Sequence, residues 1–134
     1  MSIRHGFRAY TGTPLPPLRI TTTTIPGKAR ILRLDGEVDQ HRRLQLREAL
    51  AQGVKVGPPR LVVDLSGLTF CDSTGLNALL QTRLDADAAG VLLLLAAPTA
   101  QLLRLLDVTG AQELFTIRPS VPAALADGFR PKGR

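Results

Sequence analysis

The tetrapeptide Asp-Ser-Thr-Gly at 72–75 holds the residues of this chain best suited to chemistry, because it places two hydroxyls beside a carboxylate. It follows the apolar run 61–65, which is typical of a buried strand. It precedes leucines spaced i, i+3, i+4 and i+8, which form one face of a helix: Leu76, Leu79, Leu80 and Leu84. We therefore expect a strand-to-helix turn here, with Ser73 or Thr74 at or beside the helix N-cap.

The Ser73 hydroxyl has two alternative roles at such a helix start. As an N-cap it would accept a hydrogen bond from a free backbone N–H, a contact worth about 0.5–2 kcal/mol. As an exposed phosphoacceptor it would gain about −1.5 to −2 charges, at a helix end whose dipole and free N–H groups tolerate an anion. Asp72 would then either fix the loop or orient the Ser73 hydroxyl in a kinase. Gly75 would either ease the turn or let a partner approach closely.

Other kinds of active site match the sequence poorly. Residues 71–75 read Cys-Asp-Ser-Thr-Gly, which departs from the Gly-x-Ser-x-Gly nucleophile elbow. The chain contains neither a Walker A loop nor a Gly-x-Gly-x-x-Gly fingerprint. Asp39 is close to His41 in sequence, but two isolated groups do not make a metal-ligand set, and Cys71 is expected to pack as a small apolar residue. We expect no catalysis, no cofactor and no metal.

The elements that position the tetrapeptide can be predicted from hydrophobic periodicity and turn residues. Strands at 18–25 and 31–34 would form a hairpin through Pro26-Gly27, with a loop at 36–39. A helix over 40–52 would end at Gly53. After the strand at 61–65, we expect a helix ended by Gly90, a strand at 91–97, a helix between Pro98 and Gly110, a strand at 114–117 and a helix at 121–126.

This order predicts the fold class. A hairpin followed by alternating helices and strands indicates a single α/β domain with a mixed, mostly parallel sheet flanked by helices. In such sheets, functional loops gather at the carboxyl ends of the strands. We expect three loops to converge there: 35–39, 66–75 and 97–100.

The net charge of +6 is concentrated at the two ends of the chain. Residues 1–30 hold five cations and no acid, and residues 129–134 hold three cations and no acid. The stretch 31–128 holds nine cations and eleven acids, a net charge of −2. A domain that reads nucleic acid would carry its positive charge on the fold itself, so we expect no direct nucleic-acid binding. We predict a flexible basic arm at 1–17, a domain at 18–127 and a basic tail at 128–134.

The apolar runs are too short for a membrane span. None reaches the roughly 18 residues that a span requires, and arginines interrupt the N-terminal stretch where a signal peptide would be apolar. The single cysteine cannot form an intramolecular disulfide. We therefore expect a cytoplasmic protein with no membrane partner.

Several stretches of the sequence resemble the STAS domain family, of the anti-sigma factor antagonist type. They are Gly-Glu-Val-Asp at 36–39, Leu-Val-Val-Asp-Leu at 61–65, Thr-Phe-Cys-Asp-Ser-Thr-Gly-Leu at 69–76, Leu-Leu-Arg-Leu-Leu-Asp-Val-Thr-Gly at 102–110 and Leu-Phe-Thr-Ile at 114–117. The resemblance runs in order over 18–127. The tetrapeptide alone is a weak signal, and the ordered set is a strong one.

The resemblance implies a non-catalytic, partner-switching protein. In this family the unphosphorylated form binds an anti-sigma factor, a serine kinase with an ATP-binding fold, and thereby frees a sigma factor. The kinase phosphorylates the motif serine, which falls on Ser73 here with Thr74 as the alternative, and a phosphatase acting on phospho-Ser73 resets the switch. The implied partner-binding residues are Asp39, Asp72, Ser73, Thr74, Gly75, Leu76 and Asn77.

A second function fits the same family. The chain would be a STAS subunit without a phosphate switch, scaffolding or regulating a larger complex such as a lipid transporter or a signalling assembly. In that case Ser73 would be only a helix cap.

Overall fold

A β-hairpin opens the fold of residues 18–127, the part of the chain that the computed structural model describes. Its strands, β1 (Arg19–Ile25) and β2 (Ala29–Val38), pair antiparallel without interruption. The expected turn at Pro26-Gly27 is confirmed, because Gly27 has a φ of 73°, in the left-handed region that glycine adopts without strain. The predicted arm 1–17 and tail 128–134 lie outside the described residues.

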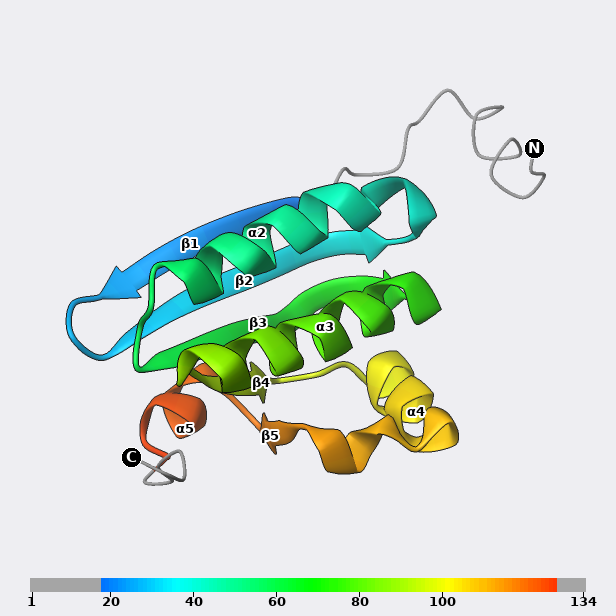
Figure 1. Cartoon of the computed structure of the whole chain (residues 1–134). Helices are drawn as coiled ribbons and strands as arrows, with labels where there is room; N and C mark the ends of the chain where they lie inside the picture. The colour runs from blue at the N-terminus through cyan, green and yellow to red at the C-terminus, as the bar shows by residue number, and fades with distance from the viewer. Residues whose placement is uncertain (1–17, 128–134) are drawn as a thin grey trace.

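The rest of the domain alternates helices and strands, which confirms the predicted fold class (Figure 1). Three parallel pairings extend the hairpin into a five-stranded sheet in the order β1-β2-β3-β4-β5. No helix within 18–127 is long and apolar enough to cross a membrane. The further elements are η1 (Gln40–Arg42), α2 (Arg43–Lys55), β3 (Arg60–Cys71), α3 (Ser73–Ala89), β4 (Leu92–Ala96), α4 (Ala100–Thr109), η2 (Ala111–Leu114), β5 (Thr116–Arg118) and α5 (Val121–Leu125).

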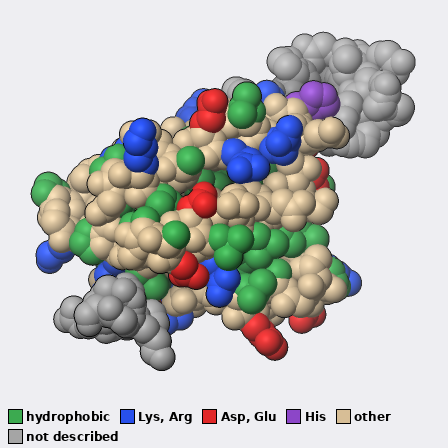
Figure 2. Space-filling model, viewed as in Figure 1, with side chains coloured by type: hydrophobic (Ala, Val, Ile, Leu, Met, Phe, Trp, Pro, Cys, Tyr) green, Lys and Arg blue, Asp and Glu red, His purple; other side chains and the backbone are tan. Residues whose placement is uncertain are grey.

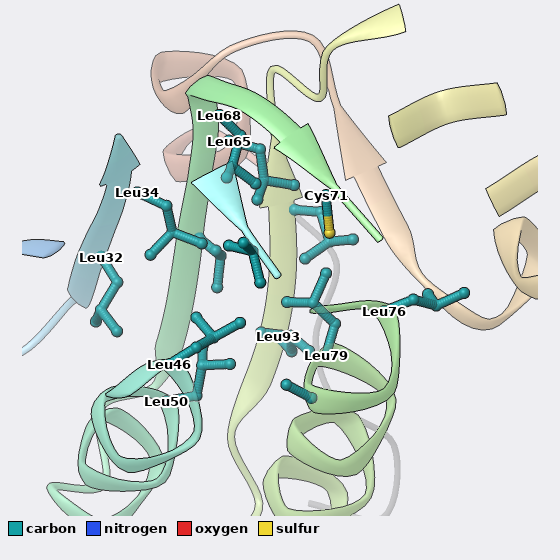
Figure 3. Close-up of a cluster of buried hydrophobic side chains, with 14 of the residues drawn as sticks. Leu32, Leu34, Leu46, Leu50, Leu65, Leu68, Cys71, Leu76, Leu79 and Leu93 are labelled. Carbon is teal, nitrogen blue, oxygen red and sulfur yellow. The ribbon is translucent and has the colours of Figure 1, made fainter. Parts of the chain in front are cut away.

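Alternation along the strands divides the buried residues between the two faces of the sheet. On one face, leucines of β2, β3 and β4 pack against α2 and α3 and form the main core (Figure 3). On the other face, Val62 and Leu94 pack against Ala124 of α5. Helices α2 and α3 lie side by side on the main face (Figure 1), and because each follows one of the parallel strands β2 and β3, both start near the same edge of the sheet.

Strands β2 and β3 are longer than the sequence suggested. The expected loop at 36–39 is wrong, since Gly36 to Val38 continue β2, and β3 runs on to Cys71 rather than ending at Leu65. The register with β2 shifts twice, after Arg33 and after Gly36, and β3 carries one extra residue at each shift. Arg33 is the β2 residue at the first register shift. Its guanidinium pairs with Asp35 at 3.0 Å and with Asp64 at 3.4 Å.

The predicted end of the first helix is also wrong. Gly53 does not stop α2, which continues to Lys55. Gly53 is buried, and a Cβ there would lie 3.0 Å from Leu61 Cδ1. This glycine therefore lets the helix pack closely on the sheet and does not provide a left-handed C-cap.

Candidate functional site

The carboxyl ends of β2 and β3 bring the two predicted acidic residues together. Val38 is the register partner of Cys71, and the Asp72 amide donates to the Val38 carbonyl at 3.2 Å. Asp39 and Asp72 are each the first residue after their strand, so they stand next to each other at one edge of the sheet. The structure therefore brings Asp39 and Asp72 together, although strand residues occupy most of 35–39 and 66–75, the segments expected to be loops.

Asp72 caps helix α3, where the sequence had suggested Ser73 or Thr74. Its backbone is extended, and its Oδ1 accepts hydrogen bonds from the Thr74 amide at 2.9 Å and the Gly75 amide at 3.3 Å. A carboxylate at a helix N-terminus also interacts favourably with the helix dipole. Ser73 therefore lies beside the N-cap, which is one of the two predicted placements, and an aspartate makes the cap because it caps as well as a serine does.

With the cap supplied by Asp72, the Ser73 side chain is left to solvent. Ser73 is the first residue of α3 and is exposed. Among residues 18–127, no side chain or backbone group forms a hydrogen bond with its hydroxyl, whereas the neighbouring Thr74 is only partly exposed. The structural need for a cap therefore does not account for a serine at position 73.

Gly75 is the contact point between α3 and the strand ends. It is buried, and a Cβ there would lie 2.5 Å from Cys71 Sγ and 2.8 Å from Val38 Cγ1. Leu76 follows it into the core at 4% exposure, and Asn77 turns outward. The most exposed residues of this turn are therefore Ser73 and Asn77, while Gly75 and Leu76 hold the turn against the sheet.

Asp39 fixes the neighbouring turn in a similar way. It is the N-cap of η1, and its Oδ1 accepts a hydrogen bond from the His41 amide at 3.0 Å. The His41 side chain is exposed to solvent, and its Nδ1 lies 3.9 Å from Asp39 Oδ2. The Asp39 side chain remains 20% exposed, so part of it reaches the surface of the site.

Gln101 is a site residue that the sequence reasoning did not find. Strand β4 pairs with β3 only as far as Asp64 opposite Ala96, so the end of β3 has no strand on that side. The Gln101 amide replaces it: its Oε1 accepts from the Cys71 amide at 3.0 Å, and its Nε2 donates to the Cys71 carbonyl at 2.7 Å. An amide side chain near the start of a leucine-rich helix was the only available signal.

Cys71 is buried beneath this turn, as expected for a small apolar residue. Its pKa is raised to about 12, first because burial disfavours the thiolate and second because Asp72 lies beside it. The thiol is therefore neutral and unreactive under ordinary conditions.

The site is an exposed edge of the sheet, and its groups suit contact with a protein. In the described chain, no three histidine, cysteine or acidic side chains gather as a metal site. Hollows of about 280 and 460 Å³ are lined by residues elsewhere, around β4, η2 and β5. Phe70, 39% exposed, adds an apolar group just before the tetrapeptide. An exposed aromatic ring suits contact with another protein, because aromatic residues are enriched at protein interfaces.

Comparison with known proteins shows which of them share this sequence pattern and this fold. The sequence pattern of the family described as the STAS domain matches residues 19–124. The structure is similar to an anti-sigma factor antagonist from Mycobacterium paratuberculosis, with 25% identity, a TM-score of 0.71, and coverage of 81% of this chain and 92% of that one. It is also similar to the anti-sigma factor antagonist SpoIIAA in its unphosphorylated form, with 18% identity, a TM-score of 0.65, and coverage of 80% and 93%.

Two further solved structures have a similar fold. The Bacillus cell fate determinant SpoIIAA in its phosphorylated form matches with 20% identity, a TM-score of 0.62, and coverage of 80% of this chain and 96% of that one. A sulfate transporter family protein from Wolinella succinogenes matches with 20% identity, a TM-score of 0.66, and coverage of 78% and 87%. These likenesses show one fold used in more than one setting.

Proposed function

Because this chain belongs to the STAS domain family, we propose that it is an anti-sigma factor antagonist controlled by phosphorylation of Ser73. Unphosphorylated, it binds an anti-sigma factor that is a serine kinase with an ATP-binding fold, and a sigma factor is released. The kinase phosphorylates Ser73 and ends the association, and a phosphatase acting on phospho-Ser73 restores it. The similarity to the Mycobacterium antagonist supports this class of function.

One observation carries the proposal: Ser73 is exposed while Asp72 caps the helix. A hydroxyl that caps a helix is engaged in that hydrogen bond, and modifying it would remove the cap. Here the first turn of α3 keeps its cap whether or not Ser73 carries a phosphate. The fold can therefore survive phosphorylation while the binding surface changes.

The physical effect of the phosphate follows from its neighbours. It adds about −1.5 to −2 charges beside Asp72 and next to the loop that holds Asp39. A partner that docks on unphosphorylated Ser73 would have to bury this charge, which is costly unless it is paired. The helix N-terminus stabilises the same charge when the protein is free. Phosphorylation thus favours the free state over the bound one.

The test compares Ser73→Ala with Ser73→Asp as baits in a lysate of the source organism. We expect Ser73→Ala to capture a small ATP-binding serine kinase and Ser73→Asp to lose it. With the purified kinase, the affinity of Ser73→Asp should fall at least about tenfold, roughly 1.4 kcal/mol. Mass spectrometry after incubation with ATP should find the phosphate on Ser73, and Thr74→Ala should still accept it.

Ser120→Asp is the matched control for added charge. Ser120 is the N-cap of α5, where its Oγ accepts from the Ala123 amide at 3.1 Å, so an aspartate can replace it. This variant should bind the kinase as the wild type does. Equal affinity of the Ser73→Ala and Ser73→Asp proteins would refute the switch.

The similarity to the sulfate transporter family protein supports a second candidate, a STAS subunit that scaffolds or regulates a larger assembly without a switch. In that case both Ser73 baits would capture the same partner, such as a transporter ATPase. The same pull-down therefore separates the two functions.

A further inference from the structure

Helix α2 carries a row of cations that the proposed switch does not use. Arg43, Arg47 and Lys55 are all exposed and lie at multiples of four residues, so the row winds slowly around the helix and Lys55 stands about 120° from Arg43. The exposed acid Glu48 lies about two turns before Lys55, on the side of the helix that Lys55 occupies. Ala51 fills the gap between them, and the row extends over about 18 Å. We call Arg43, Arg47 and Lys55 the cationic row. Figure 2 shows blue side chains over this part of the surface.

The cationic row has a cost for the isolated domain. Arg43 stands in the first turn of α2, where the helix dipole disfavours a positive charge, and the first turn holds no acid. Arg43 and Arg47 are like charges at i,i+4, which destabilises a helix. None of the ion pairs formed among residues 18–127 includes a member of the row. Local rules broken together in this way indicate a surface selected for something other than stability.

Apolar side chains border the row. Leu44 is 65% exposed and lies three residues from Arg47, on the same side of the helix. Val56 is 50% exposed at the other end, next to Lys55. Large exposed apolar groups beside charges are typical of protein interfaces, where they are removed from water on binding. Nucleic-acid phosphates would use the arginines and leave Leu44 without a contact.

The same helix is unsuited to a membrane surface. An interfacial helix needs a free apolar face to insert among lipids. The apolar face of α2 consists of Leu46, Leu50 and Val54, which are buried in the main core (Figure 3). Insertion would therefore require the domain to open.

We propose that the cationic row, with Leu44, is a docking surface for an acidic surface of a protein partner. In naming that partner as the anti-sigma kinase, this inference rests on the proposed function. Helices α2 and α3 are packed side by side (Figure 1), and their first turns follow the adjoining residues Asp39 and Asp72. A protein seated on Ser73 can therefore extend onto the first turns of α2.

The test uses the full chain labelled with nitrogen-15 and a short poly-L-glutamate peptide as the probe, followed by NMR at low salt. We expect chemical-shift changes on α2 over 43–55. Arg43→Glu with Arg47→Glu should weaken the binding at least about tenfold. The control pair, Lys28→Glu with Arg104→Glu, makes the same change in net charge at exposed residues of the hairpin turn and α4, and should keep the affinity within about twofold.

Three results would overturn the proposal. They are shift changes confined to residues outside α2, an equal loss in the control pair, and tighter binding of a short DNA duplex or of phosphatidylserine vesicles than of poly-L-glutamate. Failure of the Ser73 switch is read separately, because the peptide titration involves neither the kinase nor a change at Ser73. In the pull-down, a Ser73→Ala bait that also carries both α2 substitutions should capture less kinase. Full capture would mean that the acidic surface is not on the kinase.

Discussion

Helices α2 and α3 both follow an aspartate that comes directly after a parallel strand, and their first turns differ. Asp39 and Asp72 each accept a hydrogen bond from the amide two residues on, at 3.0 and 2.9 Å. After Asp72 come a serine, a threonine and a glycine, and the α-helix begins at once. After Asp39 come a glutamine, a histidine and two arginines, and a 3-10 turn precedes α2.

The difference lies in side-chain size and charge. Small residues let the start of α3 pack onto Val38 and Cys71 and leave one hydroxyl facing out. Long cationic residues keep the start of α2 at the surface. Under the proposals above, the start of α3 accepts a phosphate without unfolding and the start of α2 contacts a partner. The predictions below test this contrast, beginning with the largest effect.

The burial of Cys71 beneath α3 should make its thiol unreactive. Its pKa of about 12, against an ordinary value of 9.0, implies a thiolate fraction at pH 8 about 10³-fold lower than in the unfolded chain. Reaction with Ellman's reagent should be slower by at least that factor in the native protein than in denaturant. Because the folded pKa is raised, this group stabilises the fold fully below about pH 9, and the stabilisation declines as the pH rises toward 12. Rapid labelling of native protein would show that the turn is open.

Gly75→Ala should lower the stability of the domain much more than the equivalent substitution at the start of α2. A methyl group there must displace Cys71 or Val38, which we expect to cost about 1–3 kcal/mol in the free energy of unfolding. The equivalent position after Asp39 is Arg42, whose side chain makes no cap hydrogen bond. Arg42→Ala should change the stability by less than about 0.5 kcal/mol in urea titrations. Equal effects would remove the contrast.

Asp72→Ala should cost more than Asp39→Ala. Asp72 holds two amides of an α-helix, whereas Asp39 holds one amide of a 3-10 turn. We expect about 1–2 kcal/mol for Asp72→Ala and about half of that for Asp39→Ala, measured by urea unfolding. Asp72→Asn should retain most of the stability, since asparagine is an equally good cap.

Arg43→Glu should make the domain more stable. It places an acid in the first turn of α2 and creates an oppositely charged i,i+4 pair with Arg47, for a gain of about 0.3–1 kcal/mol. The gain should shrink with added salt, and thermal unfolding at two ionic strengths measures it. A loss of stability would mean that the cationic row already has a structural role.

The order of elements and the sheet flanked by helices could be predicted from the sequence because each depends on local signals. The leucine spacing in α3, the apolar run of β4 and the turn at Pro26-Gly27 all lie within a short window. The length of β3 could not be predicted in this way. Its residues 66–71 read as a polar turn, and only the bulged pairing with β2 makes them a strand.

The candidate site was predicted in part for the same reason. Its location followed from the strand-to-helix pattern and from the carboxyl-end rule. Which of Asp72 and Ser73 caps α3 depends on whose side-chain oxygen reaches the free amides. Sequence alone could not decide this, because aspartate and serine are both good caps. Gln101 was missed because it binds the backbone of Cys71, which lies 30 residues away and leaves no trace in the side-chain pattern.

The Gln101 contact makes the Cys71 amide a reporter on helix α4. That amide lies at the last residue of β3, at the edge of the sheet, and one side chain from a different helix covers it. Its hydrogen-exchange rate therefore measures how often α4 departs from the sheet, without any label on α4. Motion of α4 would also break the two Gln101 hydrogen bonds to the residue that precedes Asp72, so exchange at Cys71 reports on the support beneath the tetrapeptide.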